Sequence, residues 1–326
     1  MHKENSVFHK TVLDSGITIV SEQLPYVRSV SLGFWARTGS RNENEKNNGI
    51  SHFLEHMVFK GTPKRKSFEI AESLESLGGT INAYTGKETT CFFAHVLDEH
   101  LPLAIDVLSD IVQDPLLKEK DIEKEKLVIA EEINSINDNA EEMIYDYFHS
   151  TIFKGNSLES PILGNIDNVK SFSRNDLLNY WERNYRANNF VIAACGNLKH
   201  EELIKLVENY FRLPGSDNEI KYDKPVDISN RYLNATKKIF QSHSCLGFRS
   251  ISYTDDRKFP LLVLNTFFGN GMSSRLFQNI REKCGFTYSV YSFTDFYSDI
   301  GDFGVYMAYD KNKREEALNR VKEEFL

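Results

Sequence analysis

The chain is poor in cysteine, in long apolar runs and in positive charge. Its four cysteines, among 326 residues, lie far apart and form no Cys-x-x-Cys pair, which argues against a disulfide framework or a cysteine-ligated zinc site. No apolar run approaches the roughly 18 residues of a membrane span. The net charge of −8 disfavours a surface for nucleic acid. These absences predict a reduced, cytoplasmic protein without a membrane or nucleic-acid partner.

What is present is an ordinary globular composition, with 40% hydrophobic and 26% charged residues. The N-terminal segment lacks the apolar core of a signal peptide and the composition of a transit peptide. At roughly 150 residues per domain, the length predicts two domains. A polar stretch at 212–235, which contains Pro, Gly, Asn and Asp, predicts a linker between a first domain at 1–211 and a second at 236–326.

The order of expected elements is similar on the two sides of this linker. Before it, two strands are expected within 17–37, helices at 52–60, 68–77 and 101–112, extended chain at 80–97, and one unusually long helix at 119–153. After it, a strand, helices, two strands and a helix are expected between 244 and 326. This order predicts a related second domain, apparently incomplete at its C-terminal end.

The segment His-Phe-Leu-Glu-His at 52–56 carries the strongest chemical signal. On a helix, His52 and His56 stack one turn apart on the same face. Hydrolytic zinc sites use three protein ligands and leave a fourth position for water. Glu55 shares the ligand face and would take a proton from that water, as in the inverted zincin motif His-x-x-Glu-His. The alternative is two hydrogen-bonded helix histidines beside a solvated glutamate.

A third ligand is expected from the long helix. At 100° per residue, Glu125 and Glu132 fall on its apolar stripe, whereas Glu131 points away. Carboxylates on a core-facing stripe are costly unless they are paired or bind a metal. We therefore expect Glu132 to be the third ligand and Glu125 to orient a histidine. The alternative is that both are structural acids in salt bridges.

At this point the sequence resembles the pitrilysin/mitochondrial-processing-peptidase family of inverzincin zinc peptidases, and above all its smaller bacterial processing-protease-like members. The matching stretches are GISHFLEHMVFKGT (49–62), GGTINAYTGKETT (78–90), EKLVIAEEI (125–133) and GMSSRLFQNIREKCGFTYSVYS (271–292). The resemblance implies an α+β fold of two related domains, each a mainly antiparallel sheet packed with helices. It also implies one zinc per chain, held by His52, His56 and Glu132, with Glu125 as a supporting acid.

Further residues enter through the resemblance. It implies that Arg281 and Tyr288 hold the substrate and polarise the scissile carbonyl. The alternative is that Arg281 is a solvated helix residue and Tyr288 a packed strand residue. The run containing Asn82 and Ala83 would lie near the metal, where an edge strand could bind a peptide through main-chain hydrogen bonds. The alternative is an ordinary sheet strand.

The resulting hypothesis is a zinc-dependent endopeptidase that cleaves short or unfolded polypeptides, with Glu55 activating a zinc-bound water. The family assembles as a clamshell of four domains, which implies a homodimer or a heterodimer with a related subunit. One alternative is a non-catalytic structural or peptide-holding subunit of the same family. Another is a metallohydrolase acting on substrates other than peptides.

Overall fold

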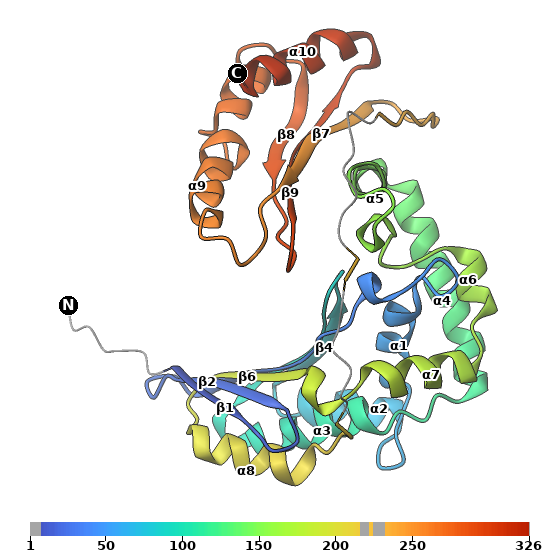
Figure 1. Cartoon of the computed structure of the whole chain (residues 1–326), viewed down its shortest axis with the longest axis vertical. Helices are drawn as coiled ribbons and strands as arrows, with labels where there is room; N and C mark the ends of the chain where they lie inside the picture. Colours follow the sequence, from blue (N-terminus) through green and yellow to red (C-terminus); the bar gives the residue numbers. More distant parts are fainter. Residues whose placement is uncertain (1–7, 216–221, 224–231, 326) are drawn as a thin grey trace. The chain divides into compact units, whose positions relative to one another are not determined.

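The computed structural model describes residues 8–215, 222–223 and 232–325. The chain forms two compact units (Figure 1). The first comprises Met1–Ile133 and Ser160–Tyr222, and the second comprises Asn134–Glu159 and Asp223–Leu326, in each case as far as these ranges are described. The chain therefore passes from the first unit to the second, returns, and passes to the second again.

A six-stranded sheet forms the centre of the first unit, in the order β1-β2-β6-β3-β5-β4. Its neighbours are antiparallel except for β2 and β6. The strands are β1 (Phe8–Val12), β2 (Thr18–Gln23), β3 (Ser29–Ala36), β4 (Thr80–Thr85), β5 (Thr90–Leu97) and β6 (Phe190–Gly196). In β3, Val30, Leu32 and Phe34 are buried on one face, whereas Ser31 and Trp35 on the other are more exposed. This alternation is typical of a sheet with one face in the core.

Helices pack on the buried face and at the β4 edge. They are α1 (Ile50–Val58), α2 (Ser67–Glu75), α3 (Leu101–Gln113), α4 (Glu119–Asp138), α6 (Ile166–Ser171), α7 (Arg174–Asn184) and α8 (His200–Tyr210). The helices α3 and α8 cover the sheet (Figure 1), and α3 begins with Pro102 in its first turn, where a missing N–H costs nothing. The helix α1 contacts β4 and α7.

The second unit has a three-stranded antiparallel sheet in the order β7-β9-β8. Its elements are α5 (Ala140–Ile152), β7 (Ser242–Ser250), α9 (Lys258–Gly269), a π-helical turn (Phe277–Glu282), β8 (Thr287–Phe293), β9 (Gly301–Tyr309) and α10 (Arg314–Phe325). All nine residues of β9 are buried. Phe303, Val305 and Met307 join one apolar core with residues of α9 and α10. The helix α5 packs against β7, where a Cβ at Gly247 would come within 2.9 Å of the ring of Phe148.

The prediction of one helix over 119–153 is wrong. The helix ends at Asp138, and a new helix starts after Asn139, whose extended backbone and side chain cap it by accepting a hydrogen bond from the amide of Glu141 at 3.1 Å. The new helix, α5, belongs to the second unit because Phe148 and Ile152 pack in a core with Tyr297.

The division of the chain therefore differs from the predicted first domain at 1–211, since residues 134–159 lie in the second unit. Much of the predicted linker, at 216–221 and 224–231, lies outside the described residues. The α+β fold with mainly antiparallel sheets is confirmed, and the second sheet is the smaller. Within the described part of the chain, no helix is both long and apolar enough to cross a membrane.

Candidate metal centre

The helix that carries the histidine motif is fixed at its start by a carboxylate. Its first amides have no partner within the helix, and Glu43 accepts hydrogen bonds from the amides of Gly49 at 2.7 Å and Ser51 at 2.8 Å. Burial raises the pKa of Glu43 to about 7, although these hydrogen bonds favour its charged form. Gly49 has φ +99°, and a Cβ there would lie 2.6 Å from the carbonyl oxygen of Leu163. Only glycine suits this entry into α1.

Two histidines and a carboxylate converge where α1 faces α4. The rings of His52 and His56 are 4.6 Å apart. The Oε2 atom of Glu132 lies 3.7 Å from Nε2 of His52 and 3.6 Å from Nε2 of His56. These separations exceed those of hydrogen bonds. Ligands held tetrahedrally at about 2.0–2.1 Å from zinc are about 3.4 Å apart, so the three atoms are spaced to surround such an ion.

The electrostatics of His52 favour metal binding. Its residue is 7% exposed, and burial, with a smaller contribution from His56, lowers the pKa of His52 to about 3. The imidazole is therefore neutral near pH 7, and the neutral form is the one that binds metals. Its Nδ1 atom is buried and has no hydrogen-bond partner among the described residues.

A carboxylate orients His56. Oε1 of Glu125 is 2.9 Å from Nδ1 of His56, and Oε2 is 2.7 Å from Nζ of Lys60. Burial acts to raise the pKa of Glu125, but the hydrogen bonds with His56 and Lys60 outweigh it, so this pKa lies below its usual value. The ionised carboxylate accepts a hydrogen bond from Nδ1–H and leaves Nε2 of His56 directed at Glu132.

Glu55 has the environment of a proton acceptor. The hydroxyl of Thr85, at the end of β4, donates to Oε2 of Glu55 at 2.5 Å. Burial raises the pKa of Glu55, and Glu132 acts in the same direction, while Thr85 and His56 oppose them. A raised pKa makes a carboxylate a better base near neutral pH.

The structure separates the acids on α4 as the helical period predicts. Glu125 is 4% exposed and Glu132 is half-buried, whereas Glu131 lies on the exposed face. Ala140 and Met143, which lie farther along the predicted helix at 119–153, belong to α5. The stripe therefore stops at the break between the two helices.

The other predicted site residues fall in two places. In the second unit, the guanidinium of Arg281 lies 4.5 Å from the ring centre of Tyr288, whose residue is 78% exposed. In the first unit, Asn82 and Ala83 lie on β4, which pairs only with β5 among the described strands and is thus an edge. The side chain of Asn82 accepts a hydrogen bond from the amide of Ala83 at 2.8 Å. The roles of these four residues in substrate binding stay predictions.

Sequence reasoning missed three residues that hold this centre together. Lys60 follows His56 by four residues. In the predicted helix at 52–60, that spacing would place the two side chains on the same face. Thr85 lies on the same side of its strand as Ile81 and Ala83. Because β4 contacts α1, the side chain of Thr85 can reach Glu55. Glu43 lies in a loop, where no sequence periodicity predicts the direction in which a side chain points.

A second group of possible ligands lies in the second unit, formed by His149, Asp295 and Asp302. Here Nε2 of His149 and Oδ2 of Asp302 are 3.2 Å apart, which is a direct hydrogen bond. This hydrogen bond gives His149 and Asp302 a structural role and favours the first group as the metal centre.

Comparison with known proteins identifies the family of the chain. The family described as insulinase (peptidase family M16) matches residues 18–166, and the peptidase M16 inactive domain matches residues 171–326. An uncharacterized zinc protease of Streptomyces coelicolor is 38% identical over 323 residues, covering 97% of this chain and 70% of that protein. One from Bacillus subtilis is 39% identical over 310 residues, covering 95% of this chain and 75% of that protein. The chain belongs to peptidase family M16.

Solved M16-like structures share the fold. A protease from Helicobacter pylori has a TM-score of 0.89 at 20% identity, and the match covers 98% of this chain and 80% of that one. A peptidase M16 inactive domain from Pseudomonas fluorescens has a TM-score of 0.92 at 18% identity, covering 98% and 78%. Within this M16 chain, His52, His56 and Glu132 lie in the part matched to the insulinase family, and Arg281 and Tyr288 lie in the part matched to the inactive domain.

Proposed function

We propose that this protein is a zinc-dependent endopeptidase. The observation that carries the proposal is the convergence of two imidazoles and one carboxylate, with a further carboxylate, Glu55, close enough to interact electrostatically with His56 and Glu132. Such a donor set of two histidines and one glutamate suits zinc in a hydrolytic site. The names of the relatives as zinc proteases support it.

Each residue has a distinct task. His52, His56 and Glu132 would hold one zinc per chain. When bound, the zinc would supply a Lewis acid that acidifies water and polarises the scissile carbonyl. Glu55 takes the proton of the attacking water and delivers it to the nitrogen of the leaving amine. Thr85 donates a hydrogen bond to Oε2 of Glu55 and so fixes the direction of the carboxylate.

The substrate we propose is a short or unfolded polypeptide. An extended peptide could add to the edge strand β4, where it would lie beside α1. By resemblance to the family, Arg281 and Tyr288 would contact the substrate, and their stacked arrangement gives a positive charge next to an exposed phenol. A cytoplasmic location and assembly as a homodimer, or as a heterodimer with a related subunit, are part of the same proposal.

The rival is a non-catalytic subunit that holds peptides, and the retention of Glu55 argues against it. To test the proposal, we would measure zinc by elemental analysis and hydrolysis of a peptide library. Glu55→Gln should keep its zinc and lose about 10²- to 10⁴-fold in turnover, since it removes only the proton acceptor. Glu75→Gln, an exposed change at the end of α2, is the control. Hydrolysis by Glu55→Gln at the parent rate would contradict the mechanism.

A further inference from the structure

Lys60 stands at the far end of a chain of contacts that leads to a metal ligand. The helix α1 ends at Val58, and two residues later the Nζ atom of Lys60 lies 2.7 Å from Oε2 of Glu125. The other oxygen of Glu125 is 2.9 Å from Nδ1 of His56. One carboxylate thus joins a lysine to a histidine, with one oxygen for each.

The burial of Glu125 makes both partners necessary. A carboxylate removed from water is costly unless its lone pairs are satisfied and its charge is balanced. Among the described residues, Glu125 has His56 and Lys60 as partners. Without Lys60, Oε2 would lose its donor, and the carboxylate could turn away from the imidazole to find another. The direction in which Nε2 of His56 points would then no longer be fixed.

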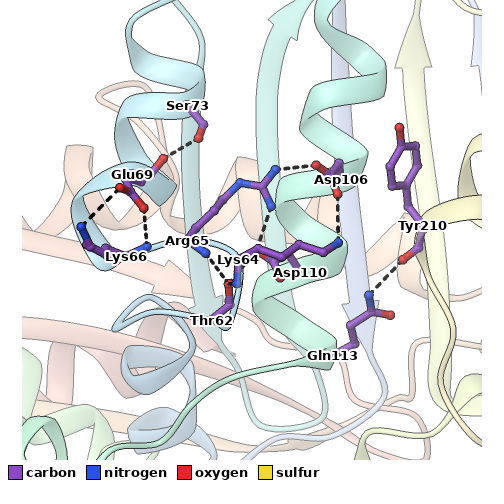
Figure 2. Close-up of polar contacts among 10 residues, drawn as sticks. All are labelled: Thr62, Lys64, Arg65, Lys66, Glu69, Ser73, Asp106, Asp110, Gln113 and Tyr210. Atoms are coloured by element: carbon purple, nitrogen blue, oxygen red, sulfur yellow. Dashed lines mark hydrogen bonds and ion pairs between the residues drawn. The ribbon is translucent and has the colours of Figure 1, made fainter.

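The segment that follows Lys60 is fixed to α3 by polar contacts of Arg65 with Asp106 and Asp110 (Figure 2). The hydroxyl of Thr62 and Nη1 of Arg65 each reach Oδ2 of the fully buried Asp110 on α3 at 2.8 Å. The other arm of Arg65 reaches Asp106, one turn earlier. The carbonyl of Gly61 accepts a hydrogen bond from the amide of Leu116 at 3.1 Å. Because the backbone is fixed, Lys60 loses less conformational freedom when it binds Glu125.

We propose that Lys60 is a positioning residue of the metal centre, which holds Glu125 so that His56 presents Nε2 to the zinc. The inference rests on the zinc ligands of the proposed function and not on peptide hydrolysis. The same segment offers a matched control. Lys64 is also a lysine, is more exposed, and lies 3.5 Å from Asp106, with no contact that leads to a ligand.

The test is the zinc dissociation constant, measured by competition with a chromophoric chelator on the whole chain at one pH. Lys60→Met should weaken zinc binding about 10-fold, the lower end of what loss of a partner behind a ligand costs. Lys64→Met should bind as the parent does. Lys60→Arg keeps the charge and should recover most of the affinity. Thermal unfolding in excess chelator checks that each metal-free variant is folded.

A double-mutant cycle shows whether Lys60 acts through Glu125. In the Glu125→Gln background, Lys60→Met should cost little more, because the carboxylate through which it acts is gone. Equal affinities for Lys60→Met and Lys64→Met, or costs of Lys60→Met and Glu125→Gln that simply add, would overturn the inference. If Lys60→Met does not fold, the zinc affinity of Glu125→Gln decides. An unchanged affinity in that variant would show that the contacts from Lys60 through Glu125 to His56 do not support zinc binding. A parent protein that binds zinc but cleaves no peptide contradicts only the proposed function.

Discussion

The hydroxyl of Thr85 lies 2.5 Å from Oε2 of Glu55, so that the last residue of an edge strand holds the proposed catalytic base. Hydrogen bonds to charged groups contribute about 1.5–3 kcal/mol. If that energy fixes Glu55 for proton transfer, Thr85→Val should lower kcat about 10- to 100-fold. The zinc content should not change, because Thr85 touches no ligand in the structure.

Thr85→Ser is the matched control, since it keeps the hydroxyl and removes only a methyl group. Its kcat should stay near that of the parent. If the serine and valine variants lost the same activity, the methyl group or the strand, and not the hydrogen bond, would be the source of the effect.

The neighbours Glu131 and Glu132 should differ in their effect on zinc. They are about 100° apart on α4, and only Glu132 lies within 3.7 Å of a histidine Nε2. Glu132→Gln should lose zinc, and Glu131→Gln should keep both zinc and activity, as measured by elemental analysis and peptide hydrolysis. Equal zinc loss in the two variants would refute the assignment of the third ligand.

Metal-free protein should lose stability in acid partly through His52. Its pKa is about 3 in the folded state and about 6.5 in an unfolded chain. Between these values the unfolded state binds more protons, so the free energy of unfolding falls as the pH drops from 6.5 toward 3. Urea unfolding in excess chelator at several pH values should show a shallower fall for His52→Gln. Parallel slopes for the parent and His52→Gln would contradict the prediction.

Two chains should be able to share one active site. In the proposed dimer, the domain facing the zinc would belong to the partner, as the resemblance implies, so Glu55→Gln and Arg281→Ala should each be nearly inactive alone. Mixed dimers would pair one intact zinc site with one intact Arg281, and activity should return to at most about half the parent's sites, given two-fold symmetry. Verified mixed dimers that stay inactive would show that Arg281 does not act across the dimer.

Much of the centre was predictable because a helix converts sequence spacing into direction. The four-residue step from His52 to His56 and the seven-residue step from Glu125 to Glu132 each return to nearly the same face. The apolar positions around them identify which face is buried. The buried faces that carry the three proposed ligands and Glu125 could therefore be predicted before the two helices were placed side by side.

The break after Asp138 was not predictable in the same way. The apolar period continues through Ala140 and Met143, and only the capping side chain of Asn139 starts a new helix. Asparagine also favours turns and loops, so by itself it is a weak signal for the start of a new helix. The partner of Glu55 was missed for a different reason. Thr85 comes from a strand 30 residues away, and no spacing rule relates a strand to a distant helix.

The position of α5 has a consequence for synthesis of the chain. Arg249 on β7 donates a hydrogen bond to the carbonyl of Ile152, 97 residues earlier. While the ribosome makes those residues, the apolar side of α5, with Phe148 and Ile152, has none of the strands against which it finally packs. Such exposed surface on a growing chain favours aggregation and recruits chaperones. Replacing the apolar residues of α5 should therefore lower the yield of folded protein in cells more than it lowers the activity of the molecules that do fold.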